Sequence, residues 1–473
     1  MTSLPYGERM AFFSSITVSV SSIETRRIRG RVDFVLDHVE HSFEIIFTYS
    51  ENISVDENLA GLIITMPAIN FAYFSREIIL NYPVSEVDRA IIEEWTRINN
   101  REVFINQICR RRYEFFRPEY VPDSSDITPE NSYGFTKVSF PISMKDKDRS
   151  EINRDGIGIL SSGGKESLLS SGIFTEIGTD PYHIFYNESG AHWLPAKTAY
   201  DHMRSSGKNV EKVWSNTDRF YKFGLRLLPC IDMEVVAKKA DSYPIQAFIF
   251  PVYIFALLPI AMKEKIGNLI MGDEFDDPLE MSDFHGMKHF YGVYDQTNTF
   301  NSRITRYFIE KGFNIRVWSA VYAINGSIEE KILIRRYPDL FSLQRSCHSC
   351  RKVGDEIVPC GICSKCLGIL LFILAAGGNP RIIGYQDVHI MNLEKNIVSG
   401  NLRLDREELD LMKMRVFKKE NPAGSHVDML HIFPEESTPL SLIPDMFREN
   451  IKRILSQYVA GTCSIENGSW KKI

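Results

Sequence analysis

The sequence shows no excess of positive charge. Its 473 residues contain 55 Lys and Arg against 61 Asp and Glu, which gives a net charge of −6 at pH 7. Proteins that bind duplex nucleic acid usually present a strongly basic face, so duplex nucleic acid is not an expected partner. The length exceeds what one small core needs and indicates roughly two to four domains.

Segments typical of export or membrane insertion are also missing. The first residues lack the basic stretch and apolar core of a signal peptide. The longest apolar run, residues 244–263, contains Gln246 and two internal prolines and ends in Lys-Glu-Lys, so it is predicted as a buried helix. Residues 367–376 are too short to cross a bilayer. We therefore expect a cytoplasmic protein with no membrane partner.

The widely spaced cysteines of a secreted disulfide framework are absent, because five of the eight cysteines fall within twenty residues. Such clustering is typical of a metal site in a reducing compartment. Cys360, Cys363 and Cys366 are each two residues apart, and Cys347 or Cys350 would supply a fourth thiolate. Four thiolates form a closed, structural zinc site. The alternative is redox or sulfur-transfer chemistry by Cys360 with Cys363, or by Cys347 with Cys350.

The pattern along the chain divides it into three parts. Residues 1–145 are predicted as an N-terminal α+β domain, and the polar stretch 143–156 marks its boundary. Residues 150–380 form the second part, and residues 381–473 a helical C-terminal extension. Within the first part the pattern predicts a strand pair and two helices, over residues 29–50, 60–80 and 88–116.

Strand-like runs alternate with helical ones in the second part. The strands are predicted at residues 156–160, 182–187, 210–216, 267–277 and 313–321. This alternation predicts an α/β fold with a doubly wound parallel sheet. Ligands of such sheets bind at the carboxyl ends of the strands. The turns that begin near Ser161, Asn187, Ser215 and Gly272 should therefore meet in one crevice.

The first of these strands leads into a glycine-rich turn, SSGGKES. The turn has neither the Gly-x-x-x-x-Gly-Lys-Ser/Thr spacing nor the Gly-x-Gly-x-x-Gly spacing of the best-known phosphate loops. Gly163 and Gly164 permit a nest of inward-pointing amides, and the following helix adds the positive end of its dipole. Side chains that would bind a phosphate group are Ser161, Ser162, Lys165 and Ser167. The alternative is a plain glycine turn between a strand and a helix.

The stretch SGGKES closely resembles the PP-loop of the N-type ATP pyrophosphatases, Ser-Gly-Gly-x-Asp-Ser, with Glu166 in place of the aspartate. A PP-loop followed by a cysteine knuckle about 180 residues later resembles the 7-cyano-7-deazaguanine synthase (QueC) family. Residues 272–277 correspond to that family's acidic strand end. That family also has a Pro-Gly-Arg-Asn stretch before its long apolar helix. At the comparable place this sequence has the proline, Pro251, and lacks the arginine. Longer relatives of this kind are the QueC-like proteins of bacterial anti-phage defence operons and the MurL muropeptide epimerases.

The resemblance implies a fold like that of the adenine nucleotide alpha hydrolases (HUP) and a ligase reaction that forms a C–N bond. ATP would adenylate a carboxylate, above all a 7-carboxy-7-deazaguanine-type acid, and release pyrophosphate. Ammonia would then give an amide, which a second activation would dehydrate to a nitrile, or a partner protein's amine would be acylated. The implied cofactors are ATP, Mg²⁺ and Zn²⁺.

The site residues that we expect fall into three groups. The catalytic residues are Lys165, Glu166 and Ser167. The nucleotide-binding residues are Ser161, Ser162, Gly163, Gly164, Lys165, Ser167, Asn187, Gly272, Asp273 and Glu274. The zinc ligands are Cys347, Cys360, Cys363 and Cys366, with Cys350 as the alternative fourth. Candidate Mg²⁺ ligands are Asp273, Glu274, Asp276 and Asp277, although these acids are equally typical of a solvated loop.

Three alternatives stay open. One is a MurL-like epimerisation of a glutamyl muropeptide, in which Asp283, His285 and His289 would act as bases or substrate contacts. The same histidines are also typical of a surface loop. The second alternative is tRNA thiolation, and the third is a nucleotide-binding module without catalysis.

Overall fold

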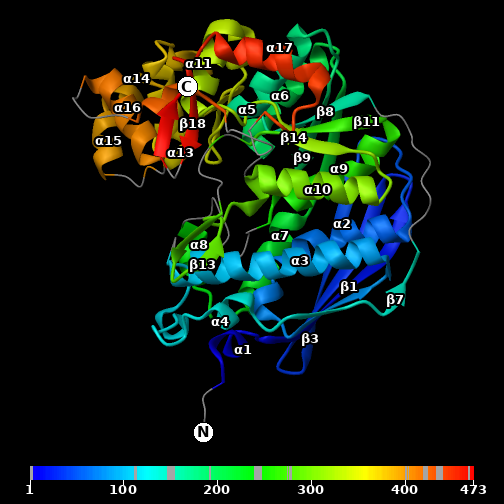
Figure 1. Ribbon diagram of the computed structural model, residues 1–473. Coiled ribbons are helices and arrows are strands. Elements are labelled where there is room, and N and C mark those ends of the chain that lie inside the picture. Colours follow the sequence, from blue (N-terminus) through cyan, green and yellow to red (C-terminus); the bar gives the residue numbers. More distant parts are fainter. Residues whose placement is uncertain are drawn as a thin grey trace.

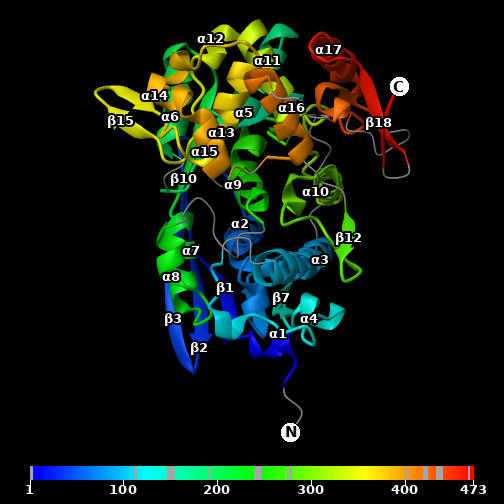
Figure 2. The ribbon, with the colours of Figure 1, turned by 90° about the vertical axis from the view of Figure 1, so that its left-hand side faces the viewer.

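The computed structural model describes most of the chain (Figure 1). The described residues are 4–110, 114–145, 155–190, 193–238, 248–273, 275, 280–399, 402, 404–418, 424–432, 440–466 and 469–473. The two ends of the chain lie at opposite ends of the molecule in Figures 1 and 2.

One ten-stranded sheet runs through the protein. Its strands, in spatial order, are β14 (Arg316–Ser319), β11 (Ile266–Met271), β8 (Gly156–Ser161), β9 (Tyr182–Asn187), β10 (Val210–Ser215), β3 (Val39–Tyr49), β2 (Arg27–Leu36), β1 (Phe13–Glu24), β4 (Glu77–Asn81) and β6 (Lys137–Ser139). The pairs β10–β3, β3–β2 and β2–β1 are antiparallel, and the other neighbours are parallel. The predicted α/β class is therefore confirmed in its coarse form, with a mixed and mostly parallel sheet.

The parallel half of the sheet reverses its strand order once. Strands β8, β9 and β10 are added in one direction, and the chain then places β11 and β14 on the other side of β8. The reversal lies between β8 and β11, whose residues Ile159 and Ile270 are opposite each other. Ligands of open α/β sheets bind outside the carboxyl ends of the strands at such a reversal. The turns after β8 and β11 begin there.

Helices connect and follow these strands. They are α5 (Lys165–Glu176), α6 (Trp193–Ser205), α7 (Thr217–Leu227), α8 (Met233–Lys238), α9 (Phe250–Lys263), α10 (Asn298–Glu310), α11 (Gly326–Arg336) and α12 (Pro338–Phe341). Helix α9 belongs to the predicted apolar run, and its residues from Ile254 to Ala261 are buried, as expected for a helix of the core. Among the described residues, none of the helices has both the length and the apolar character that crossing a bilayer requires.

The N-terminal region supplies the other five strands of the sheet, in which β1, β2 and β3 are antiparallel and β4 and β6 continue parallel to β1. Its other elements are α1 (Tyr6–Arg9), α2 (Glu57–Ile69), η1 (Ala72–Phe74), β5 (Pro83–Val84), α3 (Glu86–Glu102), the π-helix η2 (Val103–Cys109), η3 (Pro118–Tyr120), α4 (Pro129–Tyr133) and β7 (Ile142–Ser143). The predicted strand pair is present as β2 and β3. The helix predicted over residues 60–80 is wrong at its end, because residues 77–81 form β4. A short apolar run suits either state, and pairing with β1, where Ile16 faces Ile78, decides it.

The hydrophobic core crosses the predicted domain boundary. One cluster joins Phe13 and Phe34 of the N-terminal region to Val213 and Phe255 of the second part. A second cluster lies around α5, α11 and the C-terminal region. Most of the boundary itself, residues 146–154, lies outside the described residues, and the regions on either side of it share the sheet and the first cluster.

The C-terminal region packs beside the carboxyl end of the parallel half. The second part ends with β15 (Arg351–Val353), β16 (Glu356–Val358) and α13 (Ser364–Ala375). The extension that follows contains η5 (Pro380–Ile383), α14 (Asp387–Met391), α15 (Leu393–Ser399), α16 (Arg406–Phe417), η6 (Ser425–Asp428), β17 (Leu430–His431), α17 (Asp445–Ser456), β18 (Thr462–Glu466) and β19 (Ser469–Lys472). The extension is therefore not only helical, since β17, β18 and β19 form a small sheet. Buried Glu408 of α16 fixes it to α11, because Glu408 Oε1 accepts from the Ser327 amide at 3.1 Å.

Candidate functional site

The glycine turn lies at the reversal point, between β8 and α5. Gly163 has φ +75°, a left-handed conformation that favours glycine. The Gly164 amide donates to Ser162 Oγ at 3.3 Å, while the Ser167 hydroxyl donates to the Gly164 carbonyl at 3.1 Å. The Ser161 hydroxyl also donates to a carbonyl, that of Ile159. The structure therefore brings the predicted loop residues together, with two of the hydroxyl protons directed at the protein backbone.

Gly163 is required by its neighbours as well as by its backbone angle. A Cβ atom there would lie 3.3 Å from Ala196 Cα and 3.4 Å from the Pro195 carbonyl oxygen, both of α6. Contacts this close leave little room for a side chain. The loop is thus held between α5 and α6 in one shape.

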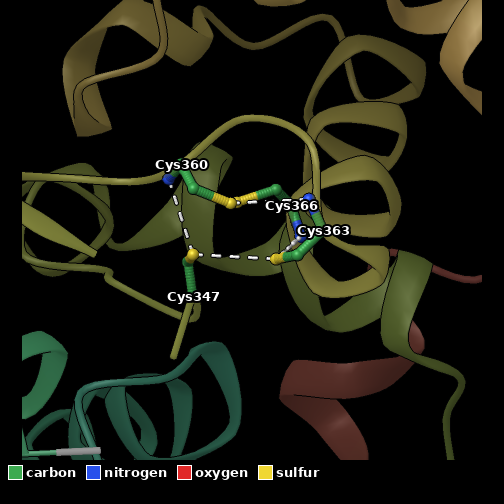
Figure 3. Close-up of side chains that lie close together, drawn as sticks. All are labelled: Cys347, Cys360, Cys363 and Cys366. Atoms are coloured by element: carbon green, nitrogen blue, oxygen red, sulfur yellow. Dashed lines mark hydrogen bonds between the residues drawn. The ribbon is translucent and has the colours of Figure 1, made fainter. Parts of the chain in front are cut away.

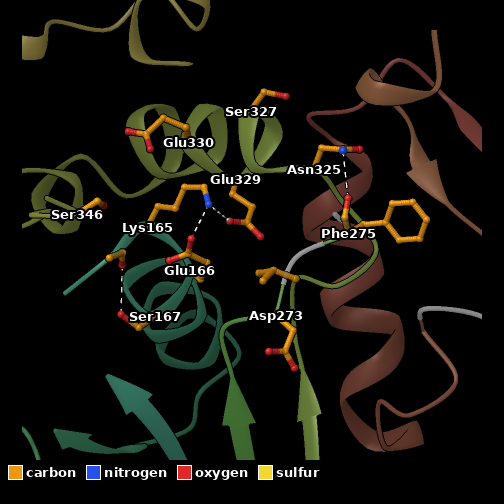
Figure 4. Close-up of polar contacts among 12 residues, drawn as sticks. Lys165, Glu166, Ser167, Asp273, Phe275, Asn325, Ser327, Glu329, Glu330 and Ser346 are labelled. Atoms are coloured by element: carbon orange, nitrogen blue, oxygen red, sulfur yellow. Dashed lines mark hydrogen bonds and ion pairs between the residues drawn. The ribbon is translucent and has the colours of Figure 1, made fainter. Parts of the chain in front are cut away.

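Lys165 is buried between two carboxylates (Figure 4). Its Nζ lies 2.5 Å from Glu166 Oε1 and 3.3 Å from Glu329 Oε2, and only 4% of its side chain is exposed. Burial raises the pKa of Glu166, but the charge of Lys165 and its hydrogen bond outweigh burial, so the pKa of Glu166 is lowered. The three groups together carry a formal charge of −1.

Carboxylates on α11 are a feature that the sequence pattern did not single out. Glu329 and Glu330 are both fully buried in the first turns of α11. Glu330 Oε2 accepts from Gln344 Nε2 at 2.9 Å. The stretch NGSIEE resembles an ordinary solvated helix start, and only the tertiary fold places Glu329 against Lys165.

The acidic strand end after β11 is described only in part. Gly272 approaches the loop, since a Cβ there would lie 3.0 Å from Glu166 Cβ. Asp273 is buried and accepts from Asn301 Nδ2 of α10 at 2.8 Å. Its carboxylate points away from Lys165 and Glu166 in Figure 4. The other predicted Mg²⁺ ligands, Glu274, Asp276 and Asp277, lie outside the described residues.

The end of β9 presents a buried acid next to the predicted Asn187. Asn187 Oδ1 accepts from the Ser189 amide at 2.9 Å, a local turn contact. Glu188 is 7% exposed, and Tyr253 of α9 donates to its Oε2 at 3.3 Å. Burial first, and then the charge of Asp218, raise the pKa of Glu188 to about 7. The sequence feature that could have indicated Glu188 is its position directly after an apolar strand.

The histidines predicted as alternative bases lie elsewhere. They belong to the hairpin of β12 (Met281–Phe284) and β13 (Met287–His289), followed by η4 (Tyr294–Gln296). His289 Nε2 lies 2.6 Å from Asp283 Oδ1, and Glu102 accepts from the Phe290 and Gly292 amides that follow the hairpin. Figures 1 and 2 place this hairpin well apart from α5. The structure does not bring His285 or His289 to the glycine loop.

Four cysteines gather at the start of α13 (Figure 3). The Sγ atoms of Cys347, Cys360, Cys363 and Cys366 all lie within 4.8 Å of one another. Two of the pairs, Cys347 with Cys363 and Cys360 with Cys366, are 3.6 and 3.7 Å apart. Four sulfurs bound to one Zn²⁺ at about 2.3 Å would be about 3.8 Å apart, so the cluster fits this ion. Cys350 is not part of the group, and Cys347 is the fourth member.

Backbone amides point at the sulfurs. Amides of Cys360, Gly361, Cys363 and Cys366 donate to cysteine Sγ atoms at 3.3 to 3.5 Å. Gly361 has φ +76°, which lets the chain turn tightly between two ligands. Such donors stabilise thiolates rather than thiols. The four-cysteine group can therefore hold a metal ion such as zinc in a closed site.

The cysteine knuckle (residues 345–366) touches the glycine loop directly. The Arg345 amide donates to the Gly163 carbonyl at 3.0 Å. Ser346 Oγ would lie 3.9 Å from a Cβ at Gly164. The two motifs that dominate the sequence are thus in direct contact.

Comparison with known proteins found no match for this chain. No protein-family model matches the chain, and neither a curated protein nor a solved structure matches it.

Proposed function

We propose that this protein is an ATP-dependent enzyme that adenylates a carboxylate and releases pyrophosphate. The observation that carries the proposal is the position of the glycine loop, at the carboxyl end of β8 where the strand order reverses. A helix N-terminus preceded by glycine amides favours anions at such a point. The arrangement of β8, β9, β10, β11 and β14 is compatible with the adenine nucleotide alpha hydrolase type of fold that the sequence resembles.

The chemistry follows from the poor leaving ability of a carboxylate oxygen. In adenylation that oxygen attacks the α-phosphorus of ATP, so that an acyl–O–P bond forms while the bond to pyrophosphate breaks. The oxygen can then leave as part of AMP, and charge develops on the departing pyrophosphate. Donors fixed in advance around this charge would lower the barrier. In this proposal the Gly163 amide faces the pyrophosphate. The Gly164 amide and the Ser167 hydroxyl would exchange their partners within the loop, Ser162 Oγ and the Gly164 carbonyl, for the pyrophosphate when it binds. Lys165 and Glu166 would keep the loop in shape.

Mg²⁺ would neutralise triphosphate charge and is part of the proposal. The geometry gives Asp273 no support as its ligand, because its carboxylate faces Asn301. Glu166 is the carboxylate next to the loop and is 23% exposed, so it fits a cation better than Asp273 does. Zinc at the cysteine cluster would serve structure, since four thiolates leave no open position.

The proposed substrate is a 7-carboxy-7-deazaguanine-type acid. Its activated acyl group would pass to ammonia with release of AMP, giving an amide that a second adenylation by ATP would dehydrate to a nitrile. Alternatively it would pass to an amine of a partner protein, as in an antiviral defence system. The gathering of Cys360 and Cys363 with two further thiolates favours a structural site over the sulfur transfer that tRNA thiolation requires.

The test is incubation with ATP, Mg²⁺ and 7-carboxy-7-deazaguanine. AMP and pyrophosphate should appear in equal amounts, with the acyl product followed by mass spectrometry. The Gly163→Ala variant should lose most of this activity. Gly178→Ala is the matched control, because Gly178 also has positive φ (+85°) but has nothing within 4 Å of a Cβ.

Two results would redirect the proposal. Turnover of a glutamyl muropeptide, without turnover of the deazaguanine acid, would favour the MurL-like epimerase. Absence of ATP cleavage with both acids, while the nucleotide still binds, would favour a binding module without catalysis.

A further inference from the structure

Helix α3 carries a groove that lies apart from the glycine loop. Figures 1 and 2 show α3 between α10 and α4, away from α5. The groove has a volume of about 170 Å³ and is lined by Glu94, Arg97, Ile98 and Arg101 of α3 and by Tyr133 of α4. Pockets for drug-sized ligands are larger, about 300–1,000 Å³. The size of this groove therefore suits one small chemical group.

Two arginines one helical turn apart line the groove. Residues four apart are neighbours on the surface of a helix, so Arg97 and Arg101 can contact the same ligand. Arg97 is exposed, and its side chain makes no ion pair or hydrogen bond within the described residues. The Arg101 side chain is only 12% exposed, with Nη2 3.5 Å from Glu280 Oε1. Its buried Nε has no hydrogen-bond partner in the described part of the chain. Both guanidinium groups therefore have unused hydrogen-bond donors.

Positive charge exceeds negative charge around the groove. Glu94 is already paired with Arg303, whose Nε lies 2.8 Å from Glu94 Oε2. Glu280 is shared between Arg101 and Lys288, at 3.5 and 3.2 Å. With the second arginine of α3, four cations therefore face two carboxylates, although the whole chain has a net charge of −6. This local excess favours an anionic ligand.

Tyr133 adds a phenol group to the lining. It is the last residue of α4, and Asn100 Nδ2 donates to its carbonyl oxygen at 2.8 Å. Asn100 precedes Arg101, so one turn of α3 holds both Arg101 and the residue across from it. The π-helix η2 begins directly after this turn, and π-helical segments are frequent at functional sites.

We propose that this groove binds a phosphate group, either free or as the ester of a small molecule. A guanidinium group offers paired N–H donors that match two phosphate oxygens, and such charge-assisted hydrogen bonds are stronger than neutral ones. Arg97 and Arg101 would both bind the phosphate, and Glu280 would give up its long contact with Arg101. The site is separate from the proposed adenylation, so each can be tested without the other.

The experiment is a calorimetric titration of the full chain with inorganic phosphate and with glycerol 3-phosphate. Arg97→Met and Arg101→Met should each weaken binding by about tenfold or more, the usual effect of removing a charged hydrogen-bond donor. Glu280→Gln breaks the same ion pair as Arg101→Met but removes a negative charge, so it should bind phosphate at least as tightly as the unaltered protein. Arg406→Met is the control for loss of an exposed arginine, since Arg406 on α16 is 93% exposed, and it should leave the affinity unchanged.

Thermal unfolding of each variant shows that it is folded. The ligand that binds more tightly, the ester or free phosphate, identifies the form that the groove takes. Equal phosphate affinity in all variants would overturn the proposal, and so would a loss in Glu280→Gln as large as in Arg101→Met. Phosphate binding that survives both arginine substitutions and is lost in Gly163→Ala would place the phosphate at the glycine loop. That result would overturn the groove site and leave the proposed function intact. Phosphate binding that depends on Arg97 and Arg101, in a protein that cleaves no ATP, would support the groove and overturn the proposed function.

Discussion

Replacing Cys363 by Ser separates the metal-binding interpretation of the cysteine cluster from a redox one. Cys363 has two tasks in the structure: its Sγ belongs to the four-sulfur group, and it caps α13 by accepting from the Cys366 amide at 3.5 Å. Serine is among the best N-cap residues. The substitution therefore keeps the cap and removes only the thiolate.

The expected loss of stability is large. Structural zinc sites bind with roughly 10–16 kcal/mol, whereas a folded domain is stable by only about 5–15 kcal/mol. Removing one ligand of four should cost about 5 kcal/mol or more. The loss reaches the core, because α13 follows the cluster directly and its residues from Cys366 to Ile373 are buried.

Zinc content by mass spectrometry and unfolding in denaturant measure the outcome. The unaltered protein should hold one zinc per chain, and Cys363→Ser should lose zinc and unfold at lower denaturant. The matched control is Cys350→Ser, which should keep the metal because Cys350 is not part of the group. A Cys363→Ser protein with unaltered stability and abolished transfer chemistry would refute the structural role and favour sulfur transfer.

Two further predictions concern stability. Lys311→Met should destabilise the fold by about 3–5 kcal/mol in urea, because it leaves the fully buried Asp88 without the ammonium 2.8 Å away. Lys288→Met, which breaks an exposed ion pair, should cost less than about 1 kcal/mol. Burial raises the folded-state pKa of Glu188 from 4.5 to about 7, so the folded state binds its proton more tightly than the unfolded chain does. This contribution to stability is full below pH 4.5 and is lost as pH rises through 7. Glu188→Gln should therefore gain up to about 3 kcal/mol over the unaltered protein between pH 5 and 8, and parallel pH profiles of the two would contradict this reasoning.

Local spacing predicted the parts of the site that are local in the structure. The glycine loop needs one strand, one turn and one helix, and the run from Gly156 to Glu176 contains all three. The knuckle needs a tight turn at Gly361 and ligands two residues apart, which the sequence also contains. The local pattern could not decide whether Cys347 or Cys350 is the fourth member of the cysteine group. The answer depends on how the residues before β15 lie against α13.

Residues whose importance comes from burial could not be predicted. Glu188 and Glu329 look like solvated acids in the sequence, and only the packing of α9 and α5 removes them from water. The reverse holds for Asp273, which the sequence favours as a metal ligand. In the structure Asn301, 28 residues later, donates a hydrogen bond to its carboxylate.

The sheet continues across the boundary that composition predicts at residues 143–156. Strand β3 ends the N-terminal hairpin and pairs with β10, so that Tyr49 faces Val213. The polar stretch before Gly156 separates the two halves in sequence, while the sheet joins them in space. Polar composition marks where a chain leaves the core, which is a different property from where a domain ends.

The separation of about 180 residues between the loop and the knuckle also has a structural reason. After β14, helices α11 and α12 carry the chain back over α5, and the Arg345 amide then meets the Gly163 carbonyl. Loss of the metal should therefore loosen the loop before it affects β1, β2 and β3, which are separated from β8 in the sheet by β9 and β10. Hydrogen exchange should detect this order, since amides that open locally exchange before those that require global unfolding.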